Sequence, residues 1–258
     1  MTDESDNTEL LRVDSAVIPC TTGSIQIRDV NWTLNRGEFH VIGGLNWSGK
    51  TDLLTTLAGL QRPVGGCQYL FGVDIDSASR AELTDLRQRI GFVFEQDGRL
   101  FTDLNVAENL ALPLSYHRDC PPGDVMKDVL RILRICGLET RATSNISELS
   151  RSLRRRVGLA RALAMEPEVL LIDTPLGNSD PVQCRWWVDF LTRLHRNKIA
   201  DMTAPSGIVV TVEDFGAWLA PERQFALLEN GRFHQLGDSA SLTDSTLPTA
   251  REMLTGNA

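Results

Sequence analysis

The chain has 258 residues, 42% hydrophobic and 23% charged, a balance typical of globular proteins with a sizeable core. Its formal net charge of −8 disfavours a nucleic-acid partner, because nucleic acid is itself polyanionic. The five cysteines are scattered and never form a CxxC pair, so neither a disulfide framework nor a zinc site is expected. The acidic N-terminus does not resemble a signal peptide, and no apolar run approaches the roughly 20 residues of a membrane helix.

The first elements in chain order are expected to form a strand-rich unit. Residues 1–8 read as a disordered tail, and alternating hydrophobicity predicts strands over 24–34 and 39–43. A Gly-rich loop then precedes an apolar-periodic helix from residue 50 to about 60, with another short strand after Gly65-Gly66. Further along, the pattern predicts helices over 79–89, 153–165 and 181–197, and strands over 90–94, 168–173, 207–211, 225–228 and 232–236.

This alternation of apolar strands with helices predicts an α/β fold with a mostly parallel sheet covered on both faces and an antiparallel β edge. The helical pattern over 103–138, interrupted by a Pro-Pro-Gly turn, predicts an inserted helical subdomain. The polar stretch over 238–249 is expected to be a loop before a short C-terminal helix. We therefore expect one domain over 1–258, with a core over 9–102 and 151–237, a helical subdomain over about 103–150 and a C-terminal tail over 238–258.

The segment over residues 44–51 fits the pattern G-x-x-x-x-G-K-[ST] at every fixed position. Glycines let a backbone wrap phosphate, and the amides at a helix N-terminus point toward the anion. Lys50 is expected to reach the β and γ phosphates, and the Thr51 hydroxyl to ligate Mg²⁺. The bland alternative is a Gly-rich turn with a surface lysine. The expected ATP-binding residues are Gly44, Asn46, Trp47, Ser48, Gly49, Lys50, Thr51 and Asp52.

A second motif complements the phosphate loop. The apolar strand over 169–172 ends in Asp173, a carboxylate expected to hold Mg²⁺ through water. Many buried strands end in an acid, so this motif carries weight only together with the loop. The two motifs predict ATP and Mg²⁺ as ligands.

Several segments resemble the ATP-binding-cassette (ABC) family in the right order. They are its Q-loop region (90–94 and 100–101), the start of its helical subdomain (105–110), its signature motif and helix (147–150 and 154–164), and its Walker B motif and D-loop (173–175 and 179–181). The resemblance runs from about residue 9 to about residue 254. It implies a P-loop NTPase fold, a homodimer or heterodimer of nucleotide-binding domains, and a membrane permease partner. It also implies a cytoplasmic protein, peripheral at the inner face of the cell membrane through the permease.

Within the family, three features look most like the ATPase subunit of Mla/MCE-type lipid-transport systems. They are the arginine run over 154–156, the Leu-Pro-Leu over 112–114 and the ending over 250–256. For the arginine run, a solvated helix face is an equally good interpretation.

The sequence departs from the family where hydrolysis is performed. The family has a Glu after the Walker B Asp, to activate the attacking water, and a His after the later strand, to contact the γ-phosphate. This chain has Thr174 and Val212 at those positions. A threonine hydroxyl is not basic near neutral pH, and loss of a positioned general base typically costs about 10²–10⁴ in rate. The sequence therefore assigns no catalytic residue, with Thr174 at the usual Glu position.

The signature segment also differs. The family's LSGGQ reads here Leu149-Ser150-Arg151-Ser152-Leu153, and in a family dimer this segment caps the ATP held by the opposite subunit. Glycine allows close backbone approach there, so Arg151 and Ser152 are expected to spoil it. Direct phosphate contact by Arg151 is the alternative.

Two further departures concern the nucleotide. Trp47 stands where the family usually has glycine, and either stacks on the nucleotide or is a rim or interface residue. No aromatic residue occupies the stretch over 20–23, where the family stacks adenine. The Q-loop register is ambiguous between Glu95 and Gln96. Gln96 is favoured as the Mg²⁺ contact, beside Thr51 and Asp173.

Three functional hypotheses remain from the sequence. The first is an ATP-binding subunit of an ABC transporter, lipid-related, with weak or absent hydrolysis and with ATP acting as a conformational ligand. The second is an active transport ATPase whose water is activated by another carboxylate, with Glu95, Glu213 and Asp180 as candidates. The third is a soluble ABC protein without a transport role, which the acidic charge and the single cassette disfavour.

Overall fold

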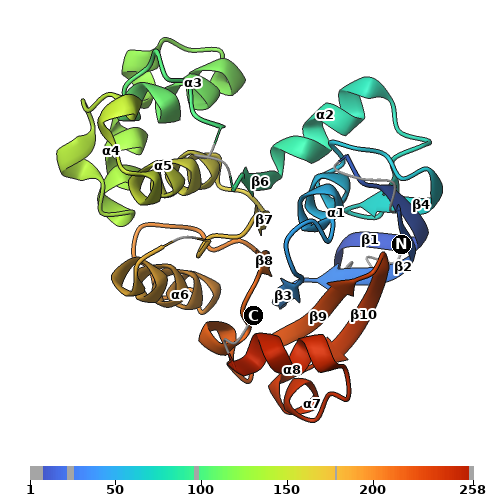
Figure 1. Ribbon diagram of the computed structural model, residues 1–258. Helices are drawn as coiled ribbons and strands as arrows, with labels where there is room; N and C mark the ends of the chain where they lie inside the picture. The colour runs from blue at the N-terminus through green and yellow to red at the C-terminus, as the bar shows by residue number, and fades with distance from the viewer. Residues whose placement is uncertain (1–7, 22–25, 96–98, 178, 256–258) are drawn as a thin grey trace.

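The computed structural model describes residues 8–21, 26–95, 99–177 and 179–255, and these fold as an α/β protein (Figure 1). The strands are β1 (Glu9–Pro19), β2 (Gln26–Asn35), β3 (Phe39–Gly43), β4 (Gly65–Leu70), β5 (Val73–Asp74), β6 (Ile90–Val93), β7 (Val169–Ile172), β8 (Gly207–Val212), β9 (Arg223–Glu229) and β10 (Arg232–Gly237). The helices are α1 (Lys50–Leu57), α2 (Arg80–Gln88), α3 (Val106–Arg118), α4 (Met126–Ile135), α5 (Arg151–Ala164), α6 (Pro181–His195), α7 (Ser239–Thr243) and α8 (Pro248–Thr255).

The strands run in the order β5-β4-β1-β2-β10-β9-β3-β8-β7-β6. The half from β9 to β6 is parallel, because β3 pairs in parallel with both β9 and β8, and β7 pairs in parallel with both β8 and β6. The other half is an antiparallel edge made by β1, β2, β4 and β5. The predicted parallel sheet with an antiparallel edge is confirmed.

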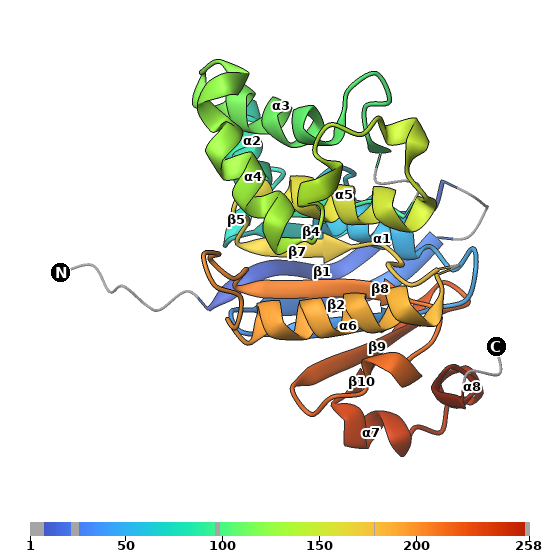
Figure 2. The same ribbon diagram turned by 90° about the vertical axis from the view of Figure 1, so that its left-hand side faces the viewer.

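The parallel strands are buried on both faces, as their unbroken apolar sequences predict. Along β7, Leu170 and Ile172 join the cluster that α3 to α6 cover, whereas Val169 and Leu171 join the cluster around α1, α2 and the antiparallel strands. This alternation follows from the two-residue period of a strand. Figure 2 shows α6 lying along the sheet and α3 and α4 standing apart from the strands.

The stretch between β6 and α5 is helical, as the sequence predicts. Asn105 begins α3 with a capping box, in which its side chain accepts a hydrogen bond from the Glu108 amide and Glu108 returns one to the Asn105 amide. The Pro-Pro-Gly interruption forms a 3-10 turn (Pro122–Val125) that leads into α4. Among the described residues, no helix has the length and apolar character to cross a bilayer.

Three elements differ from the prediction, and one of them is the two-residue strand β5, since no strand is predicted at Val73–Asp74. β1 has no predicted counterpart, because bulges break its two-residue period: its register against β2 shifts between Val13 and Ala16, and Ser15 has φ 47°. The stretch over 238–249, predicted as a loop, contains α7, which Asp238 caps by accepting a hydrogen bond from the Ser241 amide. Of the predicted disordered tail, residues 1–7 lie outside the described residues.

The C-terminal helix α8 packs beneath the end of β3. A Cβ placed on Gly43 would overlap the Phe215 ring and lie 2.8 Å from Met253 Cε. The Phe215 amide also donates a 2.8 Å hydrogen bond to the Met253 carbonyl. Any side chain at position 43 would therefore displace the Phe215 ring and crowd the end of the Met253 side chain of α8.

Candidate nucleotide-binding site

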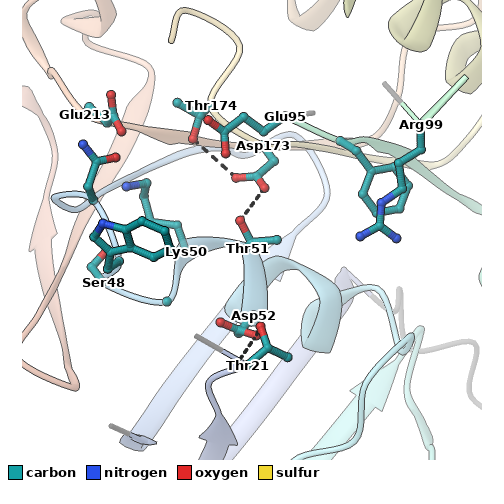
Figure 3. Close-up of a pocket in the computed structure, with 14 residues that line it drawn as sticks. Thr21, Ser48, Lys50, Thr51, Asp52, Glu95, Arg99, Asp173, Thr174 and Glu213 are labelled. Atoms are coloured by element: carbon teal, nitrogen blue, oxygen red, sulfur yellow. Dashed lines mark hydrogen bonds between the residues drawn. The ribbon is translucent and has the colours of Figure 1, made fainter. Parts of the chain in front are cut away.

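Three loops at the carboxyl ends of β3, β8 and β7 meet in one hollow of about 420 Å³. This edge is where open α/β sheets bind ligands. The loop after β3 brings Lys50 and Thr51, the end of β7 brings Asp173 and Thr174, and the end of β8 brings Glu213 (Figure 3). The two sequence motifs, separated by more than a hundred residues, are therefore close together in space.

The loop after β3 has the geometry of a phosphate cradle. Gly49 precedes α1 with φ 96°, and no side chain caps the first amides of this helix. Those amides have no partner within the helix and carry its positive dipole end, so they attract an anion. A Cβ on Gly44 would lie 2.5 Å from Ser48 Oγ and 2.9 Å from the Leu228 carbonyl oxygen, so the loop closes tightly only with glycine there.

Lys50 spans this loop from inside. Its ammonium group donates to the Gly44 carbonyl at 2.6 Å and to the Leu45 carbonyl at 3.0 Å, and the side chain is buried. Burial lowers the pKa of Lys50, while the negative charges of Glu213, Asp173 and Glu95 oppose that shift. A phosphate in the cradle would supply the oxygen acceptors now provided by backbone carbonyls.

Asp173 is buried and held at both oxygens. Oδ2 accepts a 2.6 Å hydrogen bond from the Thr51 hydroxyl, and Oδ1 accepts a 2.7 Å hydrogen bond from the Thr211 hydroxyl. Because β8 lies between β3 and β7, Thr211 on β8 is well placed to bridge toward Asp173. No motif singles out Thr211, since in the sequence it is one more residue of a buried strand.

Thr174 follows Asp173 and turns into the same hydroxyl network. Its amide donates a 3.0 Å hydrogen bond to Thr211 Oγ1, and its hydroxyl lies 3.4 Å from both Asp173 Oδ1 and Thr211 Oγ1. The residue is buried and adopts φ 41°, a left-handed conformation that is rare for a β-branched side chain. No carboxylate stands at this position to accept a proton from water.

Two carboxylates and an arginine complete the hollow. Burial raises the pKa of Glu95, and the charges of Asp173 and Glu213 raise it further, against the opposing effect of Arg155 and Lys50. Arg99 also lines the hollow, with its guanidinium 4.2 Å from the centre of the Phe94 ring. Figure 3 places Glu95 beside Asp173 and Thr174, with Arg99 on the far side of the hollow.

The residues present fit a Mg²⁺–triphosphate. Ser48 Oγ is buried in the loop with no hydrogen-bond partner in the described structure, which leaves a donor available to a bound oxygen. Thr51 and Asp173 supply hard oxygen ligands side by side, the kind that Mg²⁺ takes together with phosphate oxygens and water. Gln96, the favoured Q-loop contact, lies outside the described residues, whereas Glu95 lines the hollow.

Other predicted site residues have different surroundings. Asn46, Trp47 and Asp52 line the hollow, but the buried Asp52 carboxylate accepts hydrogen bonds from the amide and hydroxyl of Thr21, at 3.0 and 2.8 Å. No sequence motif points to Thr21. Trp47 has φ 66° and an exposed fraction of 81%, so its ring projects from the loop.

The signature-like residues stand away from this hollow, since none of them lines it. Ser150 caps α5 by accepting a hydrogen bond from the Leu153 amide, and Leu149 is buried. Arg151 is exposed at the first turn, and Ser152 Oγ is buried without a partner in the described part of the chain. The chain therefore presents this segment on a surface separate from its own cradle.

A glycine cradle opening a helix, a lysine within it and an aspartate at the end of a nearby parallel strand define a P-loop nucleotide-binding domain. The family model for the ABC transporter matches residues 27–177. The chain belongs to the ABC transporter ATP-binding family, and it is an ATP-binding subunit of that family.

Similar proteins share nearly the whole length. The intermembrane phospholipid transport system ATP-binding protein MlaF of Escherichia coli K12 is 32% identical over 247 residues, covering 95% of this chain and 89% of that protein. A probable sulfate/thiosulfate import ATP-binding protein, CysA, of Chlorella vulgaris is 37% identical over 226 residues, covering 86% and 89%. A solved dimer of the ATP-binding cassette MJ0796 in a post-hydrolysis state, bound to ADP and Pi, superposes with a TM-score of 0.75 at 26% identity, covering 88% of this chain and 99% of that one.

Proposed function

We propose that this subunit binds Mg²⁺–ATP and hydrolyses it weakly or not at all, so that ATP acts as a conformational ligand. The observation that carries the proposal is Thr174, whose hydroxyl lies within the Asp173–Thr211 network where a general base would have to stand. The cradle itself is complete, with Gly44, Lys50 and Thr51 in place. Binding and turnover therefore have separate structural requirements, and only the first set is intact.

The second half of the proposal concerns the transport complex. The chain is similar to MlaF, named for intermembrane phospholipid transport, and this supports a lipid-related cargo. Because the chain belongs to the ABC transporter ATP-binding family, we propose a membrane permease as its partner. We place the subunit at the cytoplasmic face, with a second cassette, its own copy or a related chain, completing the complex.

A hollow of about 370 Å³ offers a place for the permease. It lies where α2, α3, α5 and β6 approach one another, and Phe92, Pro113 and Met165 are among its apolar lining residues. Helix ends and loops of a partner commonly insert into grooves of this kind. The division into a core and a helical subdomain, with boundaries near residues 102 and 150, belongs to this same proposal.

An active ATPase with another water-activating group is the second candidate. The observation that favours it is Glu95, which lines the same hollow as Asp173 and lies beside Thr174 in Figure 3. Glu213 lies there too, whereas Asp180 caps α6 by accepting hydrogen bonds from the Val182 and Gln183 amides. Asp180 is thereby occupied with a structural role.

Nucleotide binding measured beside phosphate release separates the two candidates. Fluorescent ATP is titrated with Mg²⁺ into the wild type and Lys50→Ala, and phosphate release is followed for both. Binding that Lys50→Ala abolishes, with release at background, supports the proposal. If the wild type releases phosphate and both Lys50→Ala and Glu95→Gln abolish that release, the second candidate, an active ATPase, is supported instead. Absence of any ATP binding by the wild type would contradict both.

A further inference from the structure

Two exposed arginines lie opposite each other on neighbouring strands, and neither of them lines the nucleotide hollow. Arg28 on β2 and Arg232 on β10 are direct cross-strand partners, the one residue pair through which these two parallel strands are registered. The Arg28 amide donates a 3.0 Å hydrogen bond to the Gly231 carbonyl, which fixes the two backbones against each other. Both side chains are exposed and belong to the same sheet surface.

This pairing is unfavourable in the absence of a ligand. Like charges directly opposite each other on neighbouring strands destabilise a sheet. Many arginines of this acidic chain are neutralised by carboxylates, as in Arg36–Glu168, Arg89–Glu168 and Arg196–Glu222. Within the described ranges, Arg28 and Arg232 have neither an ion-pair partner nor a side-chain hydrogen bond.

The two arginines lie in a hollow of the surface. The two arginines line a hollow of about 640 Å³ together with Gln26, Asn230 and His234. Asp29 also lines it, as the single carboxylate of the set, and the half-buried Phe233 contributes an apolar side. Asn230 and Gly231 adopt φ values of 50° and 71°, forming the tight turn that brings Arg232 opposite Arg28.

We propose that Arg28 and Arg232 form a second anion site, which binds a phosphate group between their guanidinium forks. A guanidinium offers a planar pair of N–H donors that matches two oxygens of a phosphate. Two guanidinium groups on neighbouring strands can therefore bind two edges of the same phosphate group. The side chains of Gln26, Asn230 and His234 provide further donors around the same space. The proposal goes beyond the proposed function, since it concerns a different surface.

The site adjoins the nucleotide-binding edge of the sheet. The Leu228 carbonyl, near the end of β9, lies against Gly44 of the phosphate loop, and the β9–β10 turn follows two residues later. Residues at the start of β2 follow the stretch that brings Thr21 to Asp52. A phosphate held at Arg28 and Arg232 would therefore rest on strands whose ends support the cradle. The group comes either from a small phosphorylated molecule or from a lipid headgroup, and the chemistry of recognition is the same.

Pyrophosphate binding tests the site directly. Isothermal titration calorimetry is carried out on Lys50→Ala, in which the cradle has lost its lysine, and again with Arg28→Gln or Arg232→Gln added. Each added substitution is expected to weaken pyrophosphate binding at least about tenfold, because hydrogen bonds to a charged group are lost. Arg185→Gln, an exposed arginine on α6, is the matched control and should leave binding unchanged. Equal binding by all these variants would overturn the proposal.

The source of the phosphate is found by flotation with vesicles. The wild type, Arg28→Gln/Arg232→Gln and Arg185→Gln are mixed with phosphatidylglycerol or phosphatidylcholine vesicles. If the wild type and Arg185→Gln float with phosphatidylglycerol vesicles and the double variant does not, the site is supported and its ligand is a lipid headgroup. Pyrophosphate binding without such flotation supports it with a small molecule as its ligand. If the wild type neither binds pyrophosphate nor floats with phosphatidylglycerol vesicles, the proposed anion site is refuted.

Two controls keep this test independent of folding and of ATP binding. The glutamine variants remove the repulsion between the Arg28 and Arg232 guanidinium groups. Their melting temperatures should therefore equal or exceed that of the wild type. Arg232→Lys, which keeps the charge but not the fork, should bind pyrophosphate with intermediate strength. ATP binding to the cradle should survive Arg28→Gln and be lost in Lys50→Ala, so failure of one proposal leaves the other standing.

Discussion

Thr211 donates a 2.7 Å hydrogen bond to Asp173 Oδ1 and at the same time accepts one from the Thr174 amide at 3.0 Å. One hydroxyl on β8 thus fixes both the carboxylate expected to serve the metal and the backbone of the residue that follows it. Since all three residues are buried, each lost hydrogen bond leaves a polar group without water. The orientation of this corner of the site depends on a side chain that never needs to touch the nucleotide.

Replacing Thr211 by valine tests this dependence. Thr211→Val keeps the shape of the side chain and removes the hydroxyl, so the Thr174 amide loses its acceptor. We expect a loss of about 1–3 kcal/mol in the free energy of unfolding, measured by denaturant titration. Thr211→Ser, which retains the hydroxyl, is the control and should lose less. Equal stabilities for Thr211→Val and the wild type would show that the network carries no weight.

Restoring a carboxylate after Asp173 should raise hydrolysis. Thr174→Glu places a general base next to the cradle, and a positioned base contributes about 10²–10⁴ in rate. We expect phosphate release at least about tenfold above wild type, below the full factor because Arg151 and Ser152 remain in the signature segment. Thr174→Gln has a similar size without basicity and should stay at the wild-type rate. Equal rates for both variants would mean that hydrolysis is limited elsewhere.

Trp47 should cost stability through its backbone conformation. A residue with a Cβ pays about 1–2 kcal/mol in the left-handed region, whereas glycine enters it freely. Because the Trp47 ring is exposed and φ is 66°, we expect Trp47→Gly to be more stable to denaturant than Trp47→Ala by about 1 kcal/mol. An alanine variant as stable as the glycine variant would contradict the left-handed conformation of this loop.

Glu38 should make the protein acid-sensitive over a defined range. The His40 ring accepts a hydrogen bond from the Trp32 indole at Nδ1 (3.0 Å), so its proton is on Nε2, which donates to Glu38 at 3.0 Å. This hydrogen bond, helped by the Asn35 amide and side chain, lowers the pKa of Glu38 from 4.5 to about 2, against the opposing effect of burial.

The sign follows from this lowered pKa. The ionised form is favoured in the folded state, so its contribution is complete above the unfolded pKa near 4.5 and is lost as pH falls toward 2. We expect the unfolding free energy of the wild type to fall more steeply over this range than that of Glu38→Gln. Glu252→Gln, on the exposed side of α8, should follow the wild-type curve. Parallel curves for Glu38→Gln and the wild type would remove Glu38 as the cause.

The sequence predicted most of the elements because their patterns are local. The phosphate loop combines glycine, lysine and a following apolar-periodic helix within a short stretch, and α2 and α3 begin with capping boxes at Ser79 and Asn105. By contrast, β1 escaped prediction because bulges near Ser15 break its alternation. Helix α7 is only five residues long and depends on one capping aspartate, a signal that polar loops share.

The site was predicted less completely, because some of its residues are placed there only by the tertiary fold. Thr211 and Thr21 carry no motif, yet β8 brings the first to Asp173 and the stretch after β1 brings the second to Asp52. Arg99 lines the hollow after a stretch whose register the sequence left open. The choice between Glu95 and Gln96 remains a prediction, since Gln96 lies outside the described residues.

Met253 of α8 packs with Phe215 against Gly43, the last residue before the phosphate loop. Phe215 also lies only two residues after Glu213, which lines the nucleotide hollow. A partner that binds α8, or a fusion that displaces it, would therefore change the packing beneath both the loop after β3 and the end of β8. Phe215 and Met253 are the contacts through which a displacement of α8 would reach the end of β3.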